Sequence, residues 1–253
     1  MNNTVVCYFE PIQGSYFSHE SYKLLNKWKS NWESKGWNPV ILDEGFSKKN
    51  PFYEKINLSN DSTLFNSSIA AGPSNYMRQC YLRWLAYTNF VFENGPVVWC
   101  DYDVYNKSFT FEKFQTFTQT SELYCSSGSV GLMDHYNSNL ILELFDNFSK
   151  DTNAVNSTLN SNYNLKHIMK NIDYLSDMIL IQSVFFPEKI RHISTCFNEA
   201  SSTPLQSFDL FHIHGGIKNP KNYDKLPFRP PRNFNYLERD EIWDYILTII
   251  DNN

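Results

Sequence analysis

The stretch Val97-Val98-Trp99-Cys100-Asp101-Tyr102-Asp103 decides the fold. Four consecutive apolar residues without polar alternation are typical of a strand buried on both faces of a sheet. Apolar residues at helical spacing precede it from Ser74 to Phe92, and Gly95-Pro96 ends that pattern. The sequence therefore predicts a helix that leads into a central strand, with two carboxylates directly after the strand.

The segments before and after this centre alternate between strand and helix patterns. A strand from Thr4 to Phe9, a helix from His19 to Lys35 and a strand from Trp37 to Leu42 form a β-α-β start. Further strands are expected at 123–125, 129–133, 190–193 and 209–214, and further helices at 139–148, 176–186 and 237–250. This alternation predicts an α/β fold whose central sheet is mostly parallel and flanked by helices.

Ligands of such sheets gather at the carboxyl ends of the strands, where Asp101 and Asp103 stand. Two short carboxylates at positions i and i+2 can reach one cation if the chain turns there. Hard oxygen ligands favour Mg²⁺ or Mn²⁺, and either ion would in turn neutralise a diphosphate. The alternative is that this D-x-D only ends the strand and caps a turn.

A second cluster lies in the segment from His212 to Lys218, which reads HIHGGIK. Its residue types suit a metal and a phosphate together, because an imidazole can bind the metal, Gly215 lets backbone approach phosphate oxygens, and Lys218 adds positive charge. Side chains alternate along a strand, so at most one of His212 and His214 is expected to be a ligand. A hydrogen-bonded core histidine is the alternative for each.

Residues 81 to 105 resemble the glycogenin-like and lipooligosaccharide galactosyltransferase group of GT-A glycosyltransferases. In that group an arginine-bearing helix precedes a hydrophobic strand and a metal-binding D-x-D. The later HIHGGIK matches the group's H-x-x-G-x-x-K pattern at His212, Gly215 and Lys218. The resemblance implies a single GT-A, Rossmann-like catalytic domain over 1–253, with a nucleotide-sugar half at 1–110, an acceptor-side half with the metal and diphosphate loop at 111–236, and a C-terminal helix at 237–253.

Carried over residue by residue, the resemblance implies a role for each matching position. Asp101, Asp103 and His212 would bind Mn²⁺ or Mg²⁺. The diphosphate of the sugar nucleotide would be held by Asp101 and Asp103 through the metal, and directly by Gly215 and Lys218. Arg83 would lie near the diphosphate or the sugar, unless it is only a cation on the helix surface.

Weaker matches extend the candidate site. Asp177 and Gln182 resemble the group's D-Q-D-x-L-N segment, which implies that Asp177 contacts sugar hydroxyls and that Gln182 lies beside the reacting face. Asp177 could instead be a carboxylate that stabilises the start of a helix. The segment from Ser126 to Gly128 falls where the group often has Asn-Ser-Gly. Residues 74–78 separately resemble the S-D-x-x-R helix of yeast-type and capsular mannosyltransferases, with Asn in place of Asp.

The function expected from these motifs is metal-dependent transfer of a sugar from a UDP-linked donor to an acceptor hydroxyl on a glycan, protein or lipid-linked acceptor. The alignment with the glycogenin-like group implies that configuration is retained. Asp177 or Asp134 would be the general base if the enzyme is inverting. A catalytically silent nucleotide- or sugar-binding module is a further alternative. A nucleotidyltransferase is disfavoured, because the segment after the first strand carries one glycine, Gly14, and no cation.

Composition limits the remaining function classes. The chain has 253 residues with 22 basic and 27 acidic side chains, a formal charge of -5, which gives no support to sequence-independent nucleic-acid binding. No apolar run approaches the ~20 residues of a membrane span, the N-terminus lacks a signal-peptide pattern, and the five cysteines form no CxxC pair. The expected location is therefore the cytoplasm. Because the net charge is negative, any anionic ligand must be bound by positive charges that are local to its site.

Overall fold

A computed structural model describes residues 3–11, 18–54, 74–117, 123–126, 130–150, 177, 190–192, 196–197, 208–213, 220 and 230–251. The strands are β1 (Thr4–Tyr8), β2 (Asn38–Leu42), β3 (Val97–Cys100), β4 (Val104–Asn106), β5 (Leu123–Ser126), β6 (Val130–Met133), β7 (Ile190–His192), β8 (Cys196–Phe197) and β9 (Leu210–His212). The helices are α1 (Ser18–Ser34), α2 (Glu44–Lys48), α4 (Ser74–Asn94), α5 (Phe111–Phe117), α6 (His135–Lys150), the short 3-10 helix η5 (Phe234–Tyr236) and α10 (Arg239–Asp251).

Six strands form the main sheet in the order β2-β1-β3-β6-β5-β7. β1 is parallel to β2 and β3, and β5 is parallel to β7, whereas β6 is antiparallel to both of its neighbours. The α/β class and the mostly parallel sheet are confirmed, and β6 makes the sheet mixed. The three residues between β5 and β6 are too few for the crossover that a parallel pair requires, so β6 must run back along β5.

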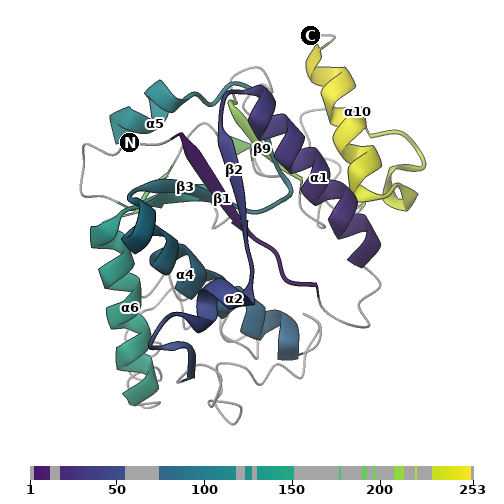
Figure 1. Cartoon of the computed structure of the whole chain (residues 1–253). Coiled ribbons are helices and arrows are strands. Elements are labelled where there is room, and N and C mark those ends of the chain that lie inside the picture. The colour runs from purple at the N-terminus through teal and green to yellow at the C-terminus, as the bar shows by residue number, and fades with distance from the viewer. Residues whose placement is uncertain are drawn as a thin grey trace, which may run out of the picture.

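Helices cover both faces of this sheet, with α1 and α10 on one side and α2, α4 and α6 on the other (Figure 1). Side chains of β1 and β3 alternate between the two layers, as a doubly covered strand requires. Val5 and Val98 pack with α1, whereas Val6 and Trp99 pack with α4. All four residues of β3 are buried, which confirms the interpretation of its apolar run.

Three tryptophans of the first β-α-β unit belong to the core beneath α1. Trp28, Trp32 and Trp37 are at most 4% exposed. Each indole N–H is satisfied internally: Trp28 donates to Cys100 Sγ at 3.1 Å, Trp32 to the Val104 carbonyl at 3.1 Å and Trp37 to the Phe109 carbonyl at 2.9 Å. These bonds tie α1 and the residue before β2 to the end of β3 and to the chain that follows it.

The order of the main sheet creates a switch point beside β3. The chain leaves β1 towards β2 on one side, and it later enters β3 on the other side of β1. Because α1 and α4 lie on opposite faces, the crossover from β1 to β2 and the crossover from β2 to β3 diverge on the two sides of β1 (Figure 1). Such divergence is where open α/β sheets bind ligands. Asp101 follows β3 at this edge.

Candidate metal and substrate site

A turn and a second sheet bring the two carboxylates of the D-x-D together with His212. The Val104 N–H donates to the Asp101 carbonyl at 3.1 Å, which turns the chain directly after β3. β4 then pairs antiparallel with β9, with Val104 opposite His212, and the Ile213 N–H donates to the Asp103 carbonyl at 2.9 Å. His212 therefore lies beside Asp103 although the two residues are far apart in the sequence.

The three side chains converge on a common point. His212 Nε2 lies 3.3 Å from Asp103 Oδ1 and 4.0 Å from Asp101 Oδ2. Among the described residues they form a group whose candidate ligand atoms all lie within 4.8 Å of one another. Two carboxylates and an imidazole are a donor set that suits Mn²⁺ or Mg²⁺. The residues present thus fit the metal expected from the sequence.

Each carboxylate of the D-x-D has one oxygen bound by an arginine, and the two arginines are different residues. Arg83 Nη1 of α4 lies 2.8 Å from Asp101 Oδ1, and Arg239 Nη1, at the start of α10, lies 2.7 Å from Asp103 Oδ2. The other oxygen of each carboxylate is the one that faces His212. The side chains of Asp103, His212 and Arg239 are no more than 13% exposed, so these contacts are shielded from water.

Arg83 also joins the D-x-D to Asp177. Its Nε and Nη2 lie 3.0 and 2.7 Å from Asp177 Oδ2, and Trp84 Nε1 donates to the same oxygen at 2.7 Å. The Asp177 side chain is 2% exposed and that of Arg83 is 11% exposed. Arg83 is therefore not a surface cation, and Asp177 is tied to the metal-site residues through it.

Proton binding at the site is shifted by burial and by the neighbouring charges. Burial raises the pKa of Asp101 to about 6, an effect that the Arg83 guanidinium opposes and the Asp103 carboxylate reinforces. Burial lowers the pKa of His212, but the charge and hydrogen bond of Asp103 outweigh it and leave this pKa above its usual 6.5. A cation bound here would therefore compete with protons.

The structure separates the other predicted residues into three groups. Ser126 pairs with Val130, which lies opposite Cys100, so the end of β5 reaches the same edge as Asp101. Asp134 lies at the opposite edge, because antiparallel β6 ends beside the start of β3, and its Oδ1 accepts the Asn137 N–H at 2.7 Å as a cap of α6. The predicted residues that lie outside the described part of the chain are Ser127, Gly128, Gln182, His214, Gly215 and Lys218.

Arg239 and Tyr102 are site residues that the sequence interpretation missed. Arg239 Nη2 lies 3.2 Å from the Tyr102 hydroxyl, and the guanidinium carbon lies 5.7 Å from the centre of the Tyr102 ring. One sequence signal was available, because Arg239 stands in the first turn of a predicted helix, where the helix dipole disfavours a cation. A cation at that position needs a compensating anion, which Asp103 provides.

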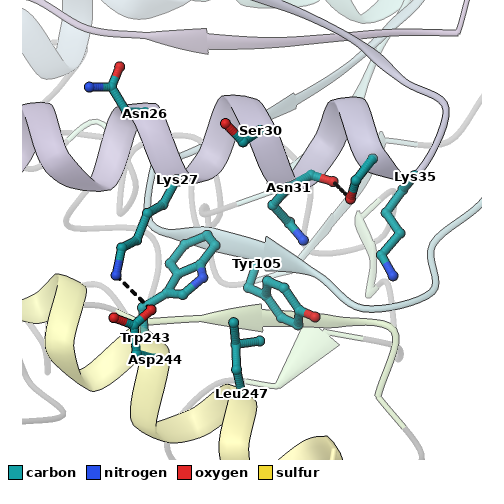
Figure 2. A pocket seen from close by; sticks show the side chains of 10 residues that line it. Asn26, Lys27, Ser30, Asn31, Lys35, Tyr105, Trp243, Asp244 and Leu247 are labelled. Atoms are coloured by element: carbon teal, nitrogen blue, oxygen red, sulfur yellow. Dashed lines mark hydrogen bonds and ion pairs between the residues drawn. The ribbon is translucent and has the colours of Figure 1, made fainter.

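A groove of about 490 Å³ lies between α1, α10 and β4, away from this cluster (Figure 2). Lys27 reaches across it to Asp244 at 2.6 Å, and Asn31 bonds both backbone groups of Asn106, at 2.7 and 3.0 Å. None of the three candidate metal ligands lines the groove. Lys27 thus joins α1 to α10, and Asn31 joins α1 to β4. The candidate site stays at the end of β3.

Comparison of the chain with protein-family models, with curated proteins and with solved structures found no match in any of the three. No helix within the described ranges is both long and apolar enough to cross a membrane.

Proposed function

We propose that this chain is a metal-dependent GT-A glycosyltransferase that moves a sugar from a nucleoside diphosphate donor, UDP-linked by the resemblance, to an acceptor hydroxyl. The observation that carries the proposal is the convergence of Asp101, Asp103 and His212 within 4.8 Å. The sequence motifs predicted this group from two segments far apart in the chain. Its position at the switch point of the sheet also favours a bound nucleotide.

The charge balance of the site supports a cation together with an anionic substrate. Asp101, Asp103 and Asp177 face two guanidinium groups, Arg83 and Arg239, so one negative charge is in excess when His212 is neutral. A divalent cation turns this excess into one positive charge. A diphosphate would then be attracted only after the cation has bound, in a chain whose net charge is -5.

The contacts of the carboxylates favour transfer with retention. Asp134 lies at the wrong edge of the sheet to be a base for this site. Asp177 Oδ2 already accepts three N–H donors in a buried position, which makes this oxygen unsuited to take a proton from an acceptor hydroxyl. We therefore assign Asp177 and Arg83 to orientation of the sugar and diphosphate, as the resemblance implies.

In the proposed reaction the bond between the anomeric carbon and the diphosphate oxygen breaks, and a bond from the anomeric carbon to the acceptor oxygen forms. The acceptor approaches from the face that the diphosphate leaves, so the departing phosphate oxygen accepts the hydroxyl proton. Mn²⁺ or Mg²⁺, when bound, supplies positive charge to the departing diphosphate. Asp101, Asp103 and His212 would hold the ion, and Arg83 would hold the carboxylates in place.

The test combines binding with turnover. UDP should raise the melting temperature when Mn²⁺ is present and leave it unchanged in EDTA. A panel of nucleotide sugars with Mn²⁺ should reveal donor hydrolysis, which Asp103→Asn abolishes while the folded chain remains. Asp244→Asn, which changes an exposed carboxylate on α10, is the matched control. Full hydrolysis in EDTA would refute the proposal.

The same experiment separates the enzyme from a silent binding module on this scaffold. Stabilisation by UDP that depends on Mn²⁺, without hydrolysis or transfer for any donor and acceptor of a broad panel, would favour the silent module. Stereochemistry of the product, measured by NMR, distinguishes retention from inversion.

A further inference from the structure

We propose that Arg239 is a positioning residue that restricts Asp103 to ligation through one oxygen and thereby makes the site prefer Mn²⁺ and Mg²⁺ over Ca²⁺. The inference rests on the metal site of the proposed function and extends it to a residue outside the sequence motifs. Arg239 acts through Asp103, whose Oδ2 it binds at 2.7 Å.

The two carboxylates share one arrangement, in which an arginine takes one oxygen and leaves the other directed at His212. Arg83 takes Asp101 Oδ1, while Asp101 Oδ2 lies 4.0 Å from His212 Nε2. Arg239 takes Asp103 Oδ2, while Asp103 Oδ1 lies 3.3 Å from the same nitrogen. An ion placed among these atoms would meet one oxygen from each carboxylate.

Arg239 is itself held in place by the surrounding residues. Its second terminal nitrogen bonds the Tyr102 hydroxyl, which lies 3.2 Å from Ser21 Oγ of α1. The guanidinium therefore cannot swing away from Asp103 without breaking contacts that join α1, the turn after β3 and α10.

One-oxygen ligation distinguishes the candidate ions. Mg²⁺ demands a compact octahedron of ligands at 2.0–2.1 Å, and water completes it readily. Ca²⁺ takes six to eight oxygens and commonly uses both oxygens of a carboxylate. Because Arg239 occupies Asp103 Oδ2, the site denies Ca²⁺ the second oxygen, a loss that the smaller ions, which need only one oxygen of this carboxylate, do not share.

The experiment measures Kd for Mn²⁺ and Ca²⁺ alone, by calorimetry on the full chain, and compares their ratio among variants. Arg239→Met removes both the positive charge and the N–H donors, whereas Arg239→Gln removes the charge but keeps a donor for Asp103 Oδ2. Loss of the positive charge strengthens the binding of both divalent ions alike, so its effect cancels in the ratio of the two Kd values. Lys23→Met removes a nearby charge and a contact of α10 without touching Asp103, and serves as the matched control.

We expect the preference for Mn²⁺ over Ca²⁺ to fall about tenfold in Arg239→Met, the scale on which partners of metal ligands act. Arg239→Gln and Lys23→Met should keep the wild-type preference. An unchanged ratio in Arg239→Met would overturn the inference and leave the metal site intact. If Arg239→Met does not fold, Arg239→Leu and Arg239→Ala, which also remove the N–H donors, take its place, and an unchanged ratio in either of them overturns the inference equally. A wild-type chain that binds no Mn²⁺ would overturn the metal site and this inference together.

Discussion

Arg83 and Asp177 form an ion pair that is almost closed to solvent, with Nη2 2.7 Å from Oδ2 and side-chain exposures of 11% and 2%. The pair joins α4 to a residue of the second half of the chain. Burial of either charge alone would be costly, because the low-dielectric surroundings cannot replace its hydration. The contact therefore links the stability of the fold to the arrangement of the candidate site.

Asp177→Ala should lower the free energy of unfolding by about 3–5 kcal/mol, the range found when one partner of a buried ion pair is removed. The loss includes the bond from Trp84 Nε1 as well as those from Arg83. Urea denaturation followed by circular dichroism measures it. Glu33→Gln, in a Lys29–Glu33 pair whose side chains are each 51% exposed, should cost at most about 1 kcal/mol. Equal losses in the two variants would contradict this account.

Local patterns sufficed to predict the centre of the fold and two of the three candidate ligands. The apolar run 97–100 predicted β3, and the residue types after it predicted that Asp101 and Asp103 would share a site. The choice of His212 required the resemblance, since the sequence alone left His214 open. Burial on both faces and the carboxyl end of a strand are properties that a short window of sequence carries.

Contacts that depend on the path of the chain could not be predicted in this way. The reversal of β6 follows from a short connection to β5, and it moves Asp134 to the edge opposite Asp101. The partner of Arg83 lies 94 positions away, and that of Arg239 lies 136 positions away. Hydrophobic periodicity predicts which face of a helix is buried, but it does not predict which distant charged residue pairs with an arginine of that helix.

Binding of Mn²⁺ should weaken as the pH falls from 7 to 5. Because burial raises the pKa of Asp101 to about 6, its carboxyl must lose a proton before it binds a cation. This single proton accounts for a loss of about tenfold in affinity over that range. Protonation of His212, whose pKa lies above 6.5, steepens the dependence further. Calorimetry at several pH values measures both contributions.

The variant His212→Gln isolates the contribution of Asp101 to the pH dependence of Mn²⁺ binding. It removes the titrating imidazole and should bind Mn²⁺ more weakly at pH 7, but it should keep the tenfold dependence between pH 7 and 5. A wild-type affinity that stays constant over this range would be incompatible with the carboxylate as a ligand.

Glu44 should stabilise the fold at neutral pH and lose this contribution in acid. Hydrogen bonds from Arg78 lower its pKa most, burial opposes them, and bonds from Tyr53 and Gln79 lower it further, to about 2. The folded pKa lies below the unfolded value of about 4.3, so the stabilisation is complete above that value and disappears as the pH falls through 2. The size of the shift corresponds to a contribution on the order of 2–3 kcal/mol.

Glu44→Gln therefore should lower the free energy of unfolding at pH 7, and the difference from the wild type should shrink between pH 4.5 and 2. Urea denaturation at four pH values measures this difference. Glu33→Gln changes an exposed carboxylate and should give a small difference at every pH. A Glu44→Gln difference that is equally large at pH 2 and pH 7 would rule out titration of Glu44 as its cause.

The indole ring of Trp99 on β3 leaves no room for a side chain at Gly131 of β6. The two residues lie opposite each other, and a Cβ atom at Gly131 would meet three atoms of the indole at 2.6–2.7 Å. The ring cannot move aside easily, because Trp84 packs edge-on against it at 4.8 Å and Tyr87 stacks on it at 5.8 Å. Gly131→Ala should therefore cost about 1–3 kcal/mol, as overpacking of a close-packed core does.

The double variant separates this clash from a general effect of alanine on the strand. Trp99→Leu is destabilising by itself because it leaves a cavity, but it removes the ring that the new methyl group would strike. Gly131→Ala should then cost much less in the Trp99→Leu background than in the wild type, a coupling that urea denaturation of all four chains measures. An equal cost in both backgrounds would mean that the indole is not what excludes a side chain from position 131.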